Sequence, residues 1–159
     1  MLEIIQYNNI SMHKQKVGYD VIDFLSKSLA LRFRLNGRYF THVIGISRGG
    51  LLPAKIISYA LEIEMLTYGI SNYSGTTQNK ETKVTQSLDF NTLDDSSRLL
   101  IIDDKADTGK TIDYIREEIG TKFEFVRYAT LFAEKRAKKK VDHYGVLVPD
   151  NTWIDFPWE

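Results

Sequence analysis

The chain has 159 residues, and its 21 lysines and arginines balance 21 aspartates and glutamates, so its formal net charge is zero. This length suits one domain with a hydrophobic core, and the neutral charge argues against general binding to nucleic acid or to an anionic membrane. Cysteine is absent, which excludes disulfides and is compatible with a cytoplasmic location, and no apolar run approaches the roughly 20 residues of a membrane span.

The N-terminal part of the chain predicts a long helix over Ser11–Leu35, with Ser11 as a possible N-cap. Apolar residues recur in it at helical spacing, at Val17, Val21, Phe24, Leu25 and Leu29. The pattern then predicts a strand over Thr41–Ile46, a helix over Leu51–Leu61 and a strand over Glu64–Ile70.

A polar segment separates these elements from the second half of the chain. Asn72–Lys83 is rich in Ser, Thr, Gly, Asn and Gln, which predicts a long flexible loop. Val84–Leu88 could return as a strand. A loop of this length inside a compact domain often has a function, such as closing over a site.

The second half predicts strands at Leu99–Ile102, Phe125–Leu131 and Tyr144–Val148, with a helix at Thr111–Ile119. Strands that alternate with helices indicate an α/β fold with a parallel sheet. We therefore expect one domain over residues 1–159, built on a mainly parallel central sheet flanked by helices.

The segment after the strand at Leu99–Ile102 carries the most informative motif, D-D-K-A-D-T-G-K-T. The paired carboxylates Asp103 and Asp104 can accept hydrogen bonds from a sugar diol or hold Mg²⁺, which prefers oxygen ligands. The following loop leads into a helix near Lys110, where unpaired backbone N–H groups suit a phosphate. Ligands of open α/β sheets bind beyond the carboxyl ends of the strands, so we expect these groups in one crevice.

Two other interpretations of this motif are possible. G-K-T occurs in nucleotide-binding P-loops, but that motif requires a glycine where this chain has Asp104. An acidic strand end also occurs in receiver domains and nucleotide hydrolases.

A second motif, S-R-G-G-L-L-P, begins at Ser47 after the strand predicted at Thr41–Ile46. Gly49 and its neighbour Gly50 allow a backbone that other residues adopt poorly, or a close contact with an anion. Arg48 can pair with two phosphate oxygens. The alternative is an ordinary glycine-rich turn.

The chain ends in N-T-W-I-D-F-P-W-E, which is unusually aromatic for a terminal segment. Terminal segments are commonly frayed unless they are tied down. An aromatic plane suits stacking on a flat heterocycle. The alternative is a hydrophobic plug or a dimer contact.

Together these residues resemble the type I phosphoribosyltransferases. D-D-x-x-D-T-G-x-T resembles the motif with which that family binds 5-phosphoribosyl 1-diphosphate. The resemblance implies that Asp103 and Asp104 contact the ribose hydroxyls and Mg²⁺, and that the 5′-phosphate is bound by Asp107, Thr108, Gly109, Lys110 and Thr111. S-R-G-G-L-x-P resembles the family's diphosphate loop, here with Arg48 and Gly49, which often contains a non-proline cis peptide.

The C-terminal segment, from about residue 133 to 159, resembles the base pocket of bacterial xanthine–guanine phosphoribosyltransferases. The resemblance implies that Trp153 stacks on a purine and that the backbone of Ile154 reads its edge. Asp155 stands where those relatives carry a glutamate. Lys135 matches their 6-oxo-binding lysine with an offset of one residue, because Glu134 intervenes.

The resemblance implies that a 6-oxopurine (hypoxanthine, guanine or xanthine) and 5-phosphoribosyl 1-diphosphate react to give a nucleoside 5′-monophosphate and diphosphate, with Mg²⁺ as the cofactor. It places Asp107 as the general base near the imidazole nitrogens of the base. It also implies a lid over residues 71–84, with Lys80 and Lys83 as diphosphate partners, and a small hood formed by the two terminal regions.

The resemblance also implies that the chain forms a homodimer or homotetramer and acts on small molecules. Two alternatives stay open from the residues. One is a non-catalytic regulatory protein that binds a nucleotide or the donor. The other is an enzyme for a pyrimidine base or orotate, against which the purine-type ending argues.

Overall fold

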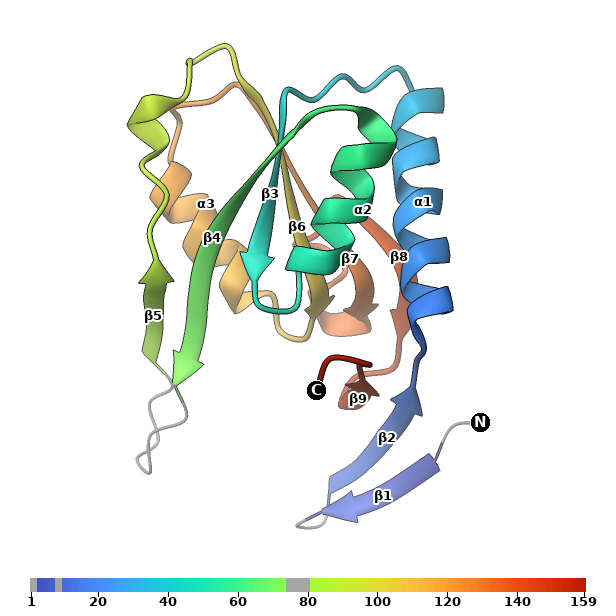
Figure 1. Ribbon diagram of the computed structural model, residues 1–159. Coiled ribbons are helices and arrows are strands. Elements are labelled where there is room, and N and C mark those ends of the chain that lie inside the picture. The colour runs from blue at the N-terminus through green and yellow to red at the C-terminus, as the bar shows by residue number, and fades with distance from the viewer. Residues whose placement is uncertain (1–2, 8–9, 74–80) are drawn as a thin grey trace.

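A six-stranded sheet forms the centre of the computed structural model, which describes residues 3–7, 10–73 and 81–159 (Figure 1). Its strands lie in the order β5-β4-β3-β6-β7-β8. Their bounds are β3 His42–Ser47, β4 Glu64–Tyr73, β5 Glu81–Gln86, β6 Arg98–Ala106, β7 Phe125–Glu134 and β8 His143–Val148. All neighbouring pairs are parallel except β4 and β5, which are antiparallel. The predicted α/β fold with a mainly parallel sheet is therefore confirmed.

Helices cover both faces of this sheet (Figure 1). Helices α1 (Tyr19–Leu35) and α2 (Leu51–Leu61) pack on one face, around Leu100 and Ile102 of β6. Helix α3 (Lys110–Ile119) packs on the other face, against Leu99 and Ile101. Because successive side chains of a strand point to opposite faces, this unbroken apolar run supplies both cores.

A second, smaller sheet joins the two ends of the chain. It contains β1 (Glu3–Tyr7), β2 (Ile10–Lys16) and β9 (Thr152–Asp155) in the order β1-β2-β9, with β2 parallel to β9. Figure 1 shows it beyond the carboxyl ends of β3, β6 and β7. This sheet is the hood expected from the terminal regions.

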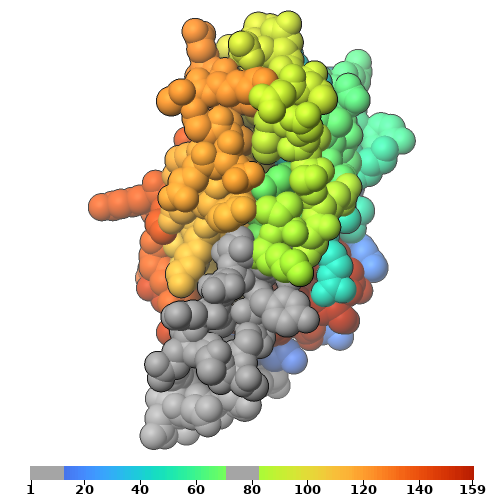
Figure 2. Space-filling view, turned by 90° about the vertical axis from the view of Figure 1, so that its left-hand side faces the viewer, coloured from blue at the N-terminus to red at the C-terminus, as the bar shows by residue number. Residues whose placement is uncertain are grey.

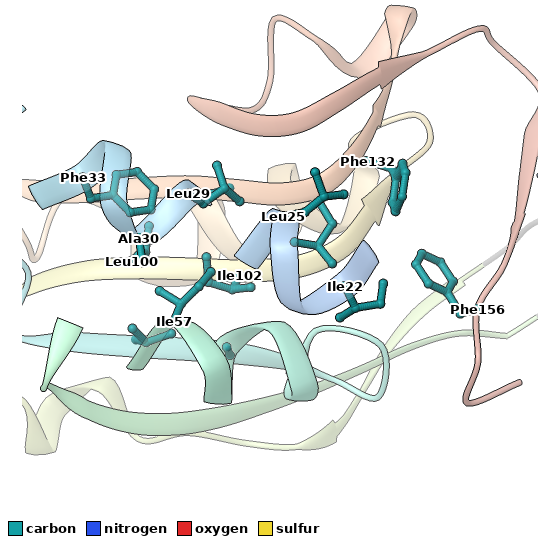
Figure 3. Packing of buried hydrophobic residues seen from close by; sticks show 14 of the residues in the cluster. Ile22, Leu25, Leu29, Ala30, Phe33, Ile57, Leu100, Ile102, Phe132 and Phe156 are labelled. Atoms are coloured by element: carbon teal, nitrogen blue, oxygen red, sulfur yellow. The ribbon is translucent and has the colours of Figure 1, made fainter. Parts of the chain in front are cut away.

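The aromatic ending of the chain ties this hood to the core. Phe156 is buried, and its ring lies 5.9 Å from that of Phe132 in β7 (Figure 3). Trp158 stacks on Phe156 with ring centroids 4.8 Å apart. The C-terminal segment is therefore packed, and β9 is held over the carboxyl end of the sheet.

The left-hand side of the molecule in Figure 1 is covered partly by α3. Figure 2 shows this face, on which α3 and the short 3-10 helix η1 (Phe90–Thr92) lie side by side. The ring of Phe90 contacts that of Phe123, with centroids 6.4 Å apart. Within the described residues, no helix is long and apolar enough to cross a membrane.

Two predictions about elements are wrong in part. The helix predicted from Ser11 begins only at Tyr19, with Gly18 as its N-cap, because Ile10–Lys16 pairs with β9 as a strand. The loop predicted over Asn72–Lys83 is shorter, since β4 continues to Tyr73 and β5 begins at Glu81. Residues 74–80, including Lys80, lie outside the described residues.

Candidate functional site

The carboxyl end of β6 forms the centre of the site. Its pairing with β3 ends at Gly45 and Ile102, but β6 continues beside β7 as far as Ala106. The strand is therefore longer than the predicted Leu99–Ile102. Asp103 and Asp104 lie in this extension, beside the end of the neighbouring strand β3 at Ser47, where the S-R-G-G loop begins.

The two motifs touch each other through the glycines of that loop. A Cβ atom on Gly49 would lie only 1.8 Å from Oδ2 of Asp104, and one on Gly50 would lie 2.4 Å from the carbonyl oxygen of Ile102. Close approach of backbone thus requires glycine at both positions. The Ser47–Arg48 peptide is cis. The close contacts of Gly49 and Gly50 with β6 disfavour an ordinary glycine-rich turn.

Asp103 and Asp104 form a crowded pair of acids. Burial, followed by the charge of Asp104, raises the pKa of Asp103 well above its usual range. Burial raises the pKa of Asp104 to about 6, although the Lys105 N–H donates to it at 2.6 Å and opposes this shift. The charge of Glu159 raises it further. Among the described residues, neither carboxylate forms an ion pair.

This acid pair fits a hard cation that keeps other oxygen ligands. Mg²⁺ would reduce the repulsion between two adjacent carboxylates that have no cationic partner. The described residues contain no cluster of three or more His, Cys, Asp or Glu side chains that could hold a metal. Asp103 and Asp104 could hold such a cation only together with oxygen ligands from elsewhere.

The D-T-G-K-T loop leads into the N-terminus of α3. Gly109 is its N-cap with φ of 75°, a left-handed conformation that favours glycine. The first backbone N–H groups of α3 point out of its N-terminal end, where an anion is favoured. Asp107, Thr108, Gly109, Lys110 and Thr111 all line one cavity of about 390 Å³. Asp103 lines the same cavity, so the structure brings this acid and the loop together, whereas Asp104 is not among the lining residues and instead lies against Gly49.

The remaining predicted residues lie outside the lining of this cavity. Arg48 is exposed in the loop before α2. Trp153 is 49% exposed in β9, Ile154 is buried, and Asp155 lies 3.6 Å from Lys14. Lys135 is exposed in the 3-10 helix η2 (Lys135–Ala137), and Lys83 is exposed in β5.

Sequence reasoning missed two residues of the site, Lys105 and Glu134. The Lys105 ammonium lies 3.0 Å from Oε1 of Glu134 and also contacts the Asp107 carboxylate. Glu134 is only 1% exposed. Two signals point to this pair: a lysine between the acids of the D-D-K-A-D motif, and a carboxylate that directly follows the apolar run of β7.

Comparisons with known proteins show which proteins this chain is similar to. A model of the phosphoribosyl transferase domain matches residues 11–159. A xanthine-guanine phosphoribosyltransferase of Idiomarina loihiensis is 32% identical over 144 residues, which are 90% of this chain and 85% of that protein. One from Ruegeria sp. is 34% identical over 142 residues, covering 83% and 78%. The crystal structure of a purine phosphoribosyltransferase from Pyrococcus horikoshii matches with a TM-score of 0.78 and 28% identity, covering 92% of this chain and 94% of that one.

Proposed function

We propose that this chain, which belongs to the phosphoribosyl transferase domain family, transfers the 5-phosphoribosyl group of 5-phosphoribosyl 1-diphosphate to a 6-oxopurine. The products are a nucleoside 5′-monophosphate and diphosphate. The observation that carries this proposal is the contact between the two motifs, in which Asp104 lies against Gly49 while Asp103 shares a cavity with the D-T-G-K-T loop. The similarity to xanthine-guanine phosphoribosyltransferases supports the choice of a 6-oxopurine.

Each group of the site has a role in binding the donor. The loop from Asp107 to Thr111 binds the 5′-phosphate through backbone N–H groups at the start of α3. Asp103 and Asp104 bind the ribose hydroxyls and would hold Mg²⁺, which neutralises charge on the departing diphosphate. Arg48 and the backbone at Gly49 bind the diphosphate.

The base lies towards the C-terminal segment in this proposal. Trp153 stacks on the purine, and the backbone of Ile154 and the side chain of Asp155 lie at its edge. Asp107 accepts a proton from the imidazole ring as the new glycosidic bond forms. Because the reaction is a substitution at a sugar carbon, the protein contributes mainly orientation and electrostatic stabilisation.

Product formation tests this proposal directly. The purified chain is incubated with Mg²⁺ and 5-phosphoribosyl 1-diphosphate, separately with hypoxanthine, guanine, xanthine, adenine, uracil and orotate. We expect conversion of at least one of the first three bases, and none of uracil or orotate. Donor binding without turnover of any base would instead favour a regulatory protein.

We propose further that the chain forms a homodimer or homotetramer through α1. Phe24, Leu31 and Leu35 are 68%, 56% and 77% exposed, and their spacing places them on one side of this helix. Such an apolar stripe is typical of an interaction surface.

Leu31→Glu is therefore expected to lower the molar mass in solution to that of one chain, because a charge placed in an apolar contact loses its hydration. Light scattering coupled to gel filtration measures this mass. Thr121→Glu, which adds the same charge at an exposed position far from α1, is the control and should leave the mass unchanged. An unchanged mass for Leu31→Glu would show that α1 is not the interface.

A further inference from the structure

Lys105 and Glu134 form an ion pair where the D-T-G-K-T loop at Asp107–Thr111, here called the phosphate loop, meets the C-terminal segment. The distance from Lys105 Nζ to Glu134 Oε1 is 3.0 Å. The same ammonium contacts the Asp107 carboxylate and donates to the carbonyl oxygen of Thr152, the first residue of β9. One cation therefore connects β6, the phosphate loop and the strand that carries Trp153.

Glu134 holds this cation in place. Its side chain is 1% exposed, and its second oxygen Oε2 accepts the Asn151 N–H at 3.0 Å and lies 2.8 Å from Nη2 of Arg136. A buried carboxylate is costly unless it is fully paired. The contacts with Lys105, Asn151 and Arg136 therefore hold the Glu134 carboxylate in one position. The Lys105 side chain is 13% exposed and lines the cavity of the site.

We propose that Lys105, positioned by Glu134, binds the oxo edge of the base and so selects oxopurines over aminopurines. This inference rests on the proposed function. An ammonium group has three donors and no acceptor. An oxo substituent supplies lone pairs to such a group, whereas an exocyclic amino group faces it with N–H donors. Lys135, the lysine expected from sequence, is exposed and lies outside the lining of the cavity.

The contacts of Lys105 also indicate which of them the base replaces. Its three donors face Glu134, Thr152 and Asp107. Glu134 is buried, and Thr152 is buried at the start of β9, whereas the Asp107 side chain is 59% exposed. A base oxygen therefore takes the place of Asp107. The exchange leaves the Asp107 carboxylate free to face the imidazole ring, which couples base binding to proton transfer.

The test compares base selectivity in matched variants. Wild type, Lys105→Met, Lys105→Gln and the exposed-lysine control Lys55→Met are assayed with hypoxanthine and with adenine. We expect Lys105→Met to lower kcat/KM for hypoxanthine by about 30- to 100-fold, with a change of less than about threefold in the KM for 5-phosphoribosyl 1-diphosphate. Lys105→Gln should raise the adenine-to-hypoxanthine ratio about tenfold, because its amide oxygen accepts hydrogen bonds. Lys55→Met should match wild type.

Glu134 is tested as a positioning residue. Glu134→Gln should lower kcat/KM for hypoxanthine about tenfold while leaving the preference for hypoxanthine in place, since the ammonium is still present. If Lys105→Met fails to fold because the buried Glu134 loses one of its two cationic partners, the double variant Lys105→Met/Glu134→Gln removes both charges and provides the same comparison. Melting temperatures identify the folded variants.

Two results would overturn the inference. One is a folded Lys105→Met or double variant that keeps wild-type kcat/KM for hypoxanthine. The other is an equal loss for hypoxanthine and adenine. Either result with an active wild type leaves the proposed function intact. A wild type that turns over no base overturns the proposed function, and the role of Lys105 with it.

Discussion

Asp107→Asn is expected to lower kcat by about 100- to 1,000-fold, the usual contribution of a positioned general base. The substitution preserves size and removes the proton-accepting charge, together with its ion pair to Lys105. The loop should keep its conformation, because Arg136 Nε donates to the backbone carbonyl of Asp107 at 3.1 Å and this bond does not involve the side chain. The KM for 5-phosphoribosyl 1-diphosphate should therefore change by less than about threefold. Steady-state kinetics with both substrates varied separates the two effects.

Asp95→Asn provides the matched control for this prediction. Asp95 is exposed at the opposite end of the sheet, before β6, and its carboxylate lies 3.6 Å from Lys122. Its replacement removes the same charge without touching the site, so turnover should stay at the wild-type level. Full turnover by Asp107→Asn would show that another group, or water, accepts the proton.

The central elements of the fold were predictable because their signals are local. The run Leu99–Ile102 is buried on both faces of the sheet, and a short apolar run with turn residues after it predicts such a strand. Helix α2 begins at Leu51 and ends at Leu61, as predicted, between a glycine pair and the left-handed Glu62.

The N-terminal strand could not be predicted in the same way. Ile10–Lys16 has no regular alternation of apolar and polar residues, and the helical pattern that follows it extends the prediction back to Ser11. Besides the adjacent β1, it pairs with β9, which is almost the whole chain away, so part of its stability comes from a long-range pairing that no local pattern records.

The residues of the candidate site differ in the same way, because some lie close together in sequence and others are brought together only by the fold. Asp103, Asp104 and the phosphate loop are contiguous in sequence, so their convergence follows from one strand and one helix. Lys105 and Glu134 are 29 residues apart, and Lys105 and Thr152 are 47 apart. Nothing in the sequence places these groups together until β6 and β7 are aligned, with Lys105 opposite Phe132. A sequence motif therefore predicts the proposed donor site, whereas the proposed contact of Lys105 with the base depends on the register of β6 and β7.

The second large effect concerns the acid pair, for which function and stability are expected to oppose each other. Asp104→Asn should abolish turnover, because it removes a ligand for the ribose hydroxyls and for Mg²⁺. It should also stabilise the free protein at pH 8. At that pH the Asp104 carboxylate is charged although it lies beside Asp103 and is partly removed from water, which is unfavourable. The asparagine side-chain oxygen can still accept the N–H of Lys105.

The pH dependence follows from the direction of the shift. Burial raises the pKa of Asp104 from 3.8 to about 6 in the folded protein, so the folded state binds the proton more tightly than the unfolded chain. The stability this group contributes is complete below about pH 4 and is lost as pH rises through about 6. Since one pKa unit corresponds to about 1.4 kcal/mol, the rise from 3.8 to about 6 means that Asp104→Asn should raise the free energy of unfolding by about 3 kcal/mol at pH 8.

Chemical denaturation at pH 4 and pH 8, without Mg²⁺ or donor, measures this difference. The gain from Asp104→Asn should shrink towards zero at pH 4, where the wild-type carboxyl group is neutral, while Asp95→Asn should show no such trend. A gain of equal size at both pH values would mean that the substitution acts through packing instead of charge. If the gain appears only at pH 8, the free protein holds a costly charge at Asp104. Binding of a cation and a sugar diol would then relieve this cost, so the site would be built for its ligands at the expense of the free protein.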